Sequence, residues 1–436
     1  MPSGRFEAII VKERGSISIP KPRLFSWVGY IFFFLMLIVP TTYQIERGIL
    51  LVVLLFNCFV FVLLRSWRLA SHIRNWAFAT ITTSILFIFL GLLNDAPGAI
   101  RVSSVFVAWP ILYVFFIGIL HTPNKFFPFY RVILIAVIVA SMMGIMVVAE
   151  KLFGINLFIT SIFEEQGASF GSFEGVVAYR LYNMTTVIYG LPFLLATVLL
   201  PRDRSPFKGK WRLAALLGLC LAVVSLLVSG RRAFWLIAGL SPVIIWALMV
   251  GVRMKTLRLN RIVSLIFLCF FLVVVSPFFG VDLQMVWKDF LRAFDITDMS
   301  NLSSYLRREQ FFALLEGWFA SPLIGNGLGA AASGSLRSVD QPWAYELSYM
   351  ALLFHTGLIG VFVYSSAVTW VFCKSIKVMR TNPVSVTLLF PVLTGLSCFL
   401  IANATNPYLG KFDYLWVLFL PVGVLNAYLL KEPRSI

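Results

Sequence analysis

Adjacent arginines occur at two places in the chain where an anionic group could be bound. Ser229 and Gly230 lead into Arg231 and Arg232 between two apolar segments, and a second pair follows far downstream, Arg307 and Arg308. A guanidinium group stays charged and binds phosphate through two parallel hydrogen bonds. We therefore predict that these four arginines bind an anionic part of a substrate. The alternative is structural: Arg231 and Arg232 would reach lipid phosphates, and Arg307 and Arg308 would pair with nearby carboxylates on an interfacial helix.

Glu346 is the carboxylate whose setting best suits proton transfer. It begins an apolar segment and is followed within a turn by Tyr349. A positioned carboxylate can act as a general base towards a hydroxyl group. The alternative is an ordinary acidic residue at a helix N-terminus, where the helix dipole favours negative charge. Tyr349, Asn403 and Asn406 are possible contacts for sugar hydroxyls, although the two asparagines also suit a simple turn.

Metal and nucleotide chemistry find little support in the residue types. The five cysteines lie in or at the ends of apolar segments without CxxC spacing, and the chain has three histidines. His355 is best explained as a buried polar residue. The glycines Gly325, Gly327 and Gly329 lack the strand-to-helix context of a nucleotide fingerprint. We predict no metal site and no cofactor.

The elements that position these residues are helices that cross a membrane. The chain is 60% hydrophobic and 13% charged, with a mean hydropathy of +0.90, whereas soluble domains carry about 25% charged residues. Apolar runs long enough to span a bilayer recur throughout. We predict an all-α polytopic protein with twelve spans near 25–42, 48–64, 76–93, 102–120, 132–149, 184–200, 213–229, 233–252, 262–280, 346–372, 384–402 and 412–430.

The charge distribution predicts the orientation of these spans. If the N-terminus is cytoplasmic, the inside segments hold 24 of the 36 basic residues and only 4 of the 19 acidic residues. Basic residues gather on the cytoplasmic side of membrane proteins. The net charge of +17 is therefore explained by contact with acidic lipid headgroups, and nucleic-acid binding is disfavoured. Both termini are expected in the cytoplasm.

One long outside loop divides the chain. We predict a cytoplasmic segment at 1–24, spans one to nine within 25–280, a periplasmic loop at 281–345, spans ten to twelve within 346–430 and a cytoplasmic tail at 431–436. Loops of this length are usually functional or disordered. Within the loop, 303–319 has the apolar periodicity of an amphipathic helix, with Arg307 and Arg308 near its start. We expect this helix at the outer membrane interface or dipping into the bundle.

These motifs together resemble the O-antigen ligase and polymerase superfamily. Arg307 with Phe311, followed by the run from Ser321 to Gly329, is similar to the superfamily's arginine, aromatic and glycine-rich signature. The segment from Glu346 to Gly360 resembles its following span, and 229–232 resembles its earlier arginine turn. The specific likeness covers about 229–235 and 303–360, and elsewhere it is one of topology.

The resemblance implies a GT-C-like membrane glycosyltransferase that acts without a metal on the outer face of the bacterial inner membrane. Its donor would be a glycan on undecaprenyl diphosphate, held by Arg231, Arg232, Arg307 and Arg308. The ligases carry a histidine where this chain has Glu346, and glutamate there suits the polymerases. The expectation is therefore an O-antigen or exopolysaccharide repeat-unit polymerase, working with a flippase and a chain-length regulator.

Two other functions remain open from the sequence. An O-antigen ligase would transfer lipid-linked glycan to the lipid A core of lipopolysaccharide. A solute transporter is the alternative of another class, but the centres of the predicted spans contain almost no charged residues. Ionisable groups at that depth usually mark the path of an ion or proton.

Overall fold

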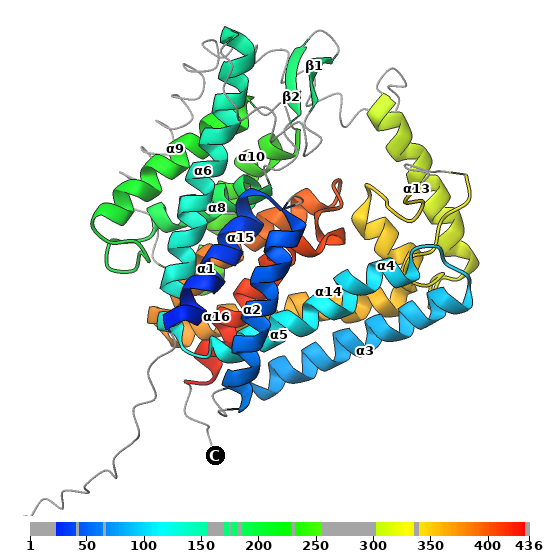
Figure 1. Cartoon of the computed structure of the whole chain (residues 1–436), viewed down its shortest axis with the longest axis horizontal. Coiled ribbons are helices and arrows are strands. Elements are labelled where there is room, and N and C mark those ends of the chain that lie inside the picture. Colours follow the sequence, from blue (N-terminus) through cyan, green and yellow to red (C-terminus); the bar gives the residue numbers. More distant parts are fainter. Residues whose placement is uncertain are drawn as a thin grey trace, which may run out of the picture.

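The computed structural model shows a bundle of helices (Figure 1). It describes residues 23–40, 43–63, 67–154, 169–173, 176–180, 185–228, 232–254, 302–334 and 340–431. Within these residues, seven helical segments are long and apolar enough to cross a membrane: Ser71–Leu93, Ala99–Ile119, Pro123–Glu150, Ala233–Val252, Ser348–Thr381, Pro383–Asn403 and Phe412–Leu429. By helix length and hydropathy, the chain is a multi-pass membrane protein.

The chain up to Val252 contains most of the described helices. They are α1 (Arg23–Ile38), α2 (Gln44–Leu63), α3 (Ser71–Leu93), α4 (Ala99–Ser103), the π-helical turn η1 (Ser104–Ala108), α5 (Trp109–Ile119), the 3-10 turn η2 (Pro123–Lys125), α6 (Phe126–Phe153), α8 (Thr185–Leu199), α9 (Lys210–Val228) and α10 (Arg232–Val252). The continuous element from Ala99 to Ile119 coincides with the fourth predicted span, with its π-helical turn in the middle.

The C-terminal half contains α13 (Leu302–Ala320), α14 (Ser348–Thr381), η4 (Pro383–Ser385), α15 (Val386–Asn403), the 3-10 turns η5 (Tyr408–Gly410) and η6 (Phe412–Tyr414), and α16 (Trp416–Leu429). The helix α13 confirms the helix predicted at 303–319. The predicted span at 262–280 lies outside the described residues.

The core centres on α15, which packs against α8, α10 and α16. Every residue of α8 except Val198 is buried, and the Tyr189 ring lies against Gly395 of α15. A Cβ at Gly395 would lie 2.7 Å from that ring. The small residue therefore allows the two helices to approach closely, as is common between membrane helices.

A two-stranded hairpin departs from the predicted all-α fold. The strands β1 (Ser169–Phe173) and β2 (Val176–Arg180) pair in antiparallel register, with Ser169 opposite Arg180. This part of the chain connects the predicted spans at 132–149 and 184–200, and its Gly and Ser residues between Gly167 and Gly175 are typical of a loop. Its Phe, Val and Tyr residues favour an extended backbone, so a short hairpin forms between α6 and α8.

The helix α14 is broken at Gly357, where φ is 58° and ψ is −167°. The glycine-rich run at 321–329 supplies the backbone hydrogen bonds that the helix lacks at this break. The amides of Asn326 and Gly327 donate to the carbonyls of Phe354 and His355 at 3.0 and 2.9 Å. In return, the amides just after the break donate to the carbonyls of Pro322 and Leu323. A broken helix at membrane depth is tolerated when protein groups satisfy its backbone in this way.

The same run crosses the C-terminal end of α3. Gly327 has a φ of 89°, and a Cβ there would overlap the backbone of Gly91. Gly329 likewise approaches the backbone of Ala99 at the start of α4, and its carbonyl accepts a 3.0 Å hydrogen bond from the Gly98 amide. The glycines at 325–329 are therefore explained by positive φ and by contact between backbones, and this contact joins α3, α4 and α14.

We expect Gly327→Ala to destabilise the fold strongly. The methyl group would enter the backbone of Gly91, and overpacking of this kind costs about 1–3 kcal/mol. Gly334→Ala is the matched control, because Gly334 has nearly the same φ of 88° but has no atom within 4 Å of an added Cβ. Thermal unfolding of the full chain in detergent would compare them. Equal melting temperatures would show that only the positive φ matters.

Candidate functional site

The candidate site begins with the contact between α13 and the start of α14 (Figure 1). Gln310, Leu314 and Gly317 lie on one face of α13 at spacings of four and three residues, and the side chains of Gln310 and Leu314 are buried. A Cβ at Gly317 would lie 2.5 Å from the Phe354 ring of α14. This small residue brings α13 close to α14. Phe312 and Phe319 are exposed, so these apolar side chains of α13 do not pack against α14.

Arg307 and Glu346 meet across this contact. The Arg307 Nε donates to Glu346 Oε2 at 2.6 Å, and the side chains are 32% and 24% exposed. The two residues are 39 positions apart in the sequence. The structure thus brings together two of the residues predicted separately as an anion binder and a base. Their partial exposure leaves the pair accessible from outside the helix contact.

Gln310 fixes the position of Glu346. Its Oε1 accepts hydrogen bonds from the amides of Glu346 and Leu347 at 2.7 and 3.2 Å. These amides precede α14, where the first N–H groups lack partners within the helix. Gln310 is only 4% exposed. It was not singled out in the sequence, because one amide in an amphipathic helix carries no distinctive signal.

The structure describes the other three predicted arginines to different extents. The Arg308 guanidinium carbon lies 5.8 Å from the centre of the Phe312 ring on the next turn of α13, a cation–π contact. Arg231 lies outside the described residues, and of Arg232 only its place as the first residue of α10 is described. The proposed role of these two arginines therefore stays a prediction.

The possible sugar contacts lie near the start of α14. Ser348 Oγ donates to the carbonyl of Asn406 at 3.4 Å, and Tyr349 Oη donates to the carbonyl of Leu400 at 2.6 Å. Asn403 is 2% exposed, and its Oδ1 accepts from the Leu409 amide. The geometry of Asn403 is that of a turn. Tyr349, by contrast, is 44% exposed beside the site.

Tyr345 and His355 hold the segment after α13 against α14. The Tyr345 hydroxyl accepts from the Ala332 amide at 2.5 Å and donates to the Ala330 carbonyl at 3.4 Å. The His355 Nε2 lies 3.0 Å from the same carbonyl. Burial raises the pKa of the Tyr345 phenol, so this group remains a neutral donor. Both residues have the structural role predicted for His355.

No known family model matches the chain, and no curated protein matches it either. The resemblance to the O-antigen ligase and polymerase superfamily therefore rests on the motifs at 229–235 and 303–360 alone. In the described part of the chain, no group of three or more His, Cys, Asp or Glu residues could hold a metal ion.

A second ion pair was missed in the sequence analysis. Arg47 at the start of α2 pairs with Asp413 in η6, and each side chain is 5% exposed. Arg47 Nη1 also donates to the carbonyls of Val39 and Pro40, the former at 3.0 Å. The partners are 366 positions apart, so no local pattern indicates their contact. This pair joins the turn after α1 to the start of α16.

Proposed function

We propose that the chain is a membrane glycosyltransferase that polymerises oligosaccharide repeat units carried on undecaprenyl diphosphate. The observation that carries this proposal is the 2.6 Å contact between Arg307 and Glu346. It places a cation suited to a diphosphate next to a carboxylate suited to a hydroxyl group. Glycosyl transfer from a lipid diphosphate needs both groups within reach of one anomeric carbon.

The roles of the two residues follow from their chemistry. Glu346 takes the proton of the acceptor hydroxyl, whose oxygen forms a bond to the anomeric carbon. The bond from that carbon to the diphosphate oxygen breaks, and the diphosphate leaves with the electron pair. Arg307 uses one N–H of its five to hold Glu346 in the described contact. The other donors are suited to the charge that develops on the leaving group.

The surroundings of the pair suit a large substrate. Tyr349 is exposed on the first turn of α14, where an aromatic ring can pack against a sugar. Arg308 adds a second positive charge on α13. Under this proposal, Arg231 and Arg232 complete the binding of the diphosphate, and Asn406 contributes to binding of the sugars.

The proposal also includes the number of membrane spans and their orientation. Twelve spans would place both termini in the cytoplasm of a bacterial inner membrane, with a GT-C-like arrangement and the Glu346 end of α14 facing outwards. The product would be O-antigen or exopolysaccharide. A flippase would deliver the lipid-linked repeat unit to that face, and a chain-length regulator would act on the growing polymer.

Deletion of the gene separates the proposed polymerase from the two alternatives. We expect surface polysaccharide on a gel to shrink to single repeat units attached to their acceptor, because transfer to the acceptor does not need polymerisation. Loss of all repeats would instead indicate a ligase. Normal ladders, together with solute flux through the purified protein in proteoliposomes, would support a transporter and contradict our proposal.

A further inference from the structure

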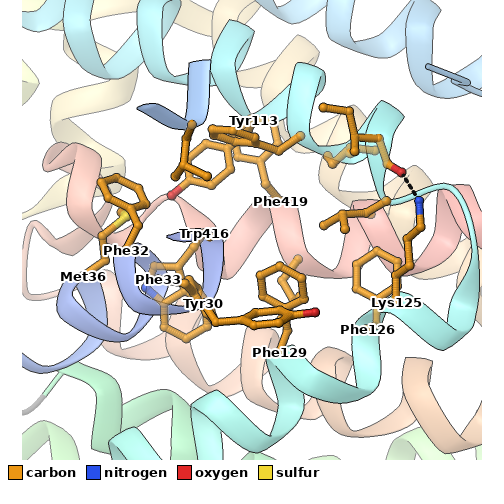
Figure 2. Close-up of a pocket in the computed structure, with 18 of the residues that line it drawn as sticks. Tyr30, Phe32, Phe33, Met36, Tyr113, Lys125, Phe126, Phe129, Trp416 and Phe419 are labelled. Atoms are coloured by element: carbon orange, nitrogen blue, oxygen red, sulfur yellow. Dashed lines mark hydrogen bonds between the residues drawn. The ribbon is translucent and has the colours of Figure 1, made fainter. Parts of the chain in front are cut away.

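A cavity of about 500 Å³ lies between α1, α2, α5, α6 and α16 (Figure 2). Protein interiors contain few voids larger than a water molecule, whereas ligand pockets measure about 300–1,000 Å³. No residue of α13 or α14 lines this cavity. It is therefore separate from the Arg307–Glu346 site and of a size to hold a ligand.

Aromatic rings form most of its wall. Phe33 packs edge-to-face on both Phe129 and Trp416, with ring centres 5.5 Å apart in each contact. Tyr113 stacks on Phe419 with ring centres 4.8 Å apart and an angle of 4° between the rings. Figure 2 shows these rings around one common space. Because a bound water needs two to four polar partners, such a wall favours a hydrocarbon occupant.

One end of the cavity is cationic. Lys125 is the charged residue among those that line it. Its Nζ donates to the Ile119 carbonyl at 2.8 Å, the dashed line in Figure 2. An ammonium group has three N–H donors, and within the described residues this is the one hydrogen bond of the Lys125 ammonium. Two donors thus remain for an anionic group at this end.

The position of the cavity restricts what can enter it. Residues of α5, α6 and α16 that line it belong to segments apolar enough to cross a membrane. The cavity is not enclosed but opens to the surface of the bundle, and the half-buried side chains of Tyr30, Phe116 and Phe129 lie along its wall. That surface faces lipid when the helices are in a bilayer. A ligand dissolved in the membrane therefore has direct access.

We propose that this cavity binds one acyl chain of a glycerophospholipid with an acidic headgroup, whose phosphate contacts Lys125. The aromatic wall suits contact with the acyl chain, and the ammonium group of Lys125 suits contact with the acidic headgroup. The lipid would fill the gap between α1 and α16 and hold those helices together. This inference does not depend on the proposed glycosyl transfer, because the two sites share no residue.

Photolabelling of the full chain in nanodiscs tests the occupant. The probe is phosphatidylglycerol with a diazirine in its acyl chain, and we expect labelled peptides from α1, α5 and α6. Gly29→Phe would fill the cavity and abolish this labelling. An added Cβ at Gly29 meets Leu54 at 3.6 Å, an ordinary contact, so the variant is expected to fold. Leu120→Trp, at another residue that lines the cavity, is a second cavity-filling variant.

Gly239→Phe is the matched control for the cavity-filling variants. It places the same ring on exposed Gly239 of α10, where an added Cβ meets no atom within 4 Å, and it should retain labelling. Labelling that persists in both Gly29→Phe and Leu120→Trp would overturn the proposal. Melting temperatures of the variants would confirm that each remains folded.

The headgroup is tested by exchanging the probe. Wild-type protein should be labelled more strongly by the phosphatidylglycerol probe than by the matching phosphatidylcholine probe, and Lys125→Gln should remove this preference. Lys208→Gln, at an exposed loop position, should keep it. Equal labelling of the wild type by both probes would overturn the role of Lys125. Displacement of the probe by a polyprenyl phosphate, but not by unlabelled phosphatidylglycerol, would overturn the phospholipid assignment.

Discussion

Replacing Glu346 with Gln should reduce glycosyl transfer by about 10²- to 10⁴-fold, the usual contribution of a general base. The amide keeps the size of the side chain and can still accept from Arg307, but it cannot take a proton from the acceptor. Polymer ladders should therefore shorten to single repeats. Purified protein with a lipid-linked repeat unit would show the loss in kcat, with the KM for the donor little changed.

Glu309→Gln is the matched control for this experiment. Glu309 lies on the same helix as Arg307 and is exposed, so the substitution removes an equal charge without touching Glu346. It should leave ladder length unchanged. If Glu346→Gln gave normal ladders, or if Glu309→Gln had an equal effect, the role of Glu346 as a base would be wrong. A pH profile would distinguish loss of a base from misplacement of α13.

Replacing Asp413 with Ala should destabilise the protein by about 3–5 kcal/mol, because it leaves the buried Arg47 charge without its carboxylate. Both side chains are 5% exposed, so water does not compensate. The unfolding temperature of the full chain in detergent would fall markedly. Asp203→Ala is the control, because its pairing with Arg204 at 3.8 Å is exposed and worth only about 0–1 kcal/mol.

A double substitution separates charge from packing at this pair. Arg47→Met combined with Asp413→Leu removes both charges and replaces them with apolar side chains. Such swaps of buried ion pairs are often neutral or stabilising. We expect the double variant to be more stable than Asp413→Ala alone. A double variant that is less stable than Asp413→Ala would show that the hydrogen bonds of Arg47 to Val39 and Pro40 matter more than its unpaired charge.

The long apolar runs made most helices predictable from the sequence. The segments at α8, α10 and α15 each coincide with a predicted span, because a chain in lipid must satisfy its own backbone and a helix does so locally. The helix α13 was predictable for a different reason, because the apolar residues of 303–319 repeat with the period of a helix over several turns. The hairpin was not predictable, because each strand has only five residues and Gly and Ser interrupt the first strand.

The site was predictable in part. The types and setting of Arg307 and Glu346 suggested their chemistry, but not that they touch. Their contact depends on Gln310 and Gly317, which bring α13 against α14. The glycines after α13 were attributed to a family signature, whereas their backbones cross Gly91 and Ala99. Contacts between such distant segments leave no periodic pattern in a single sequence.

The break in α14 also constrains how the protein is made. Its carbonyls at Phe354 and His355 are satisfied by the backbone of Asn326 and Gly327, which leave the ribosome first. Without those partners, each open carbonyl would cost several kcal/mol in hydrocarbon. The break in α14 therefore cannot enter the bilayer alone at low cost. The run at 322–329 and α14 should leave the insertion machinery as one hairpin-like unit, before α15 is synthesised.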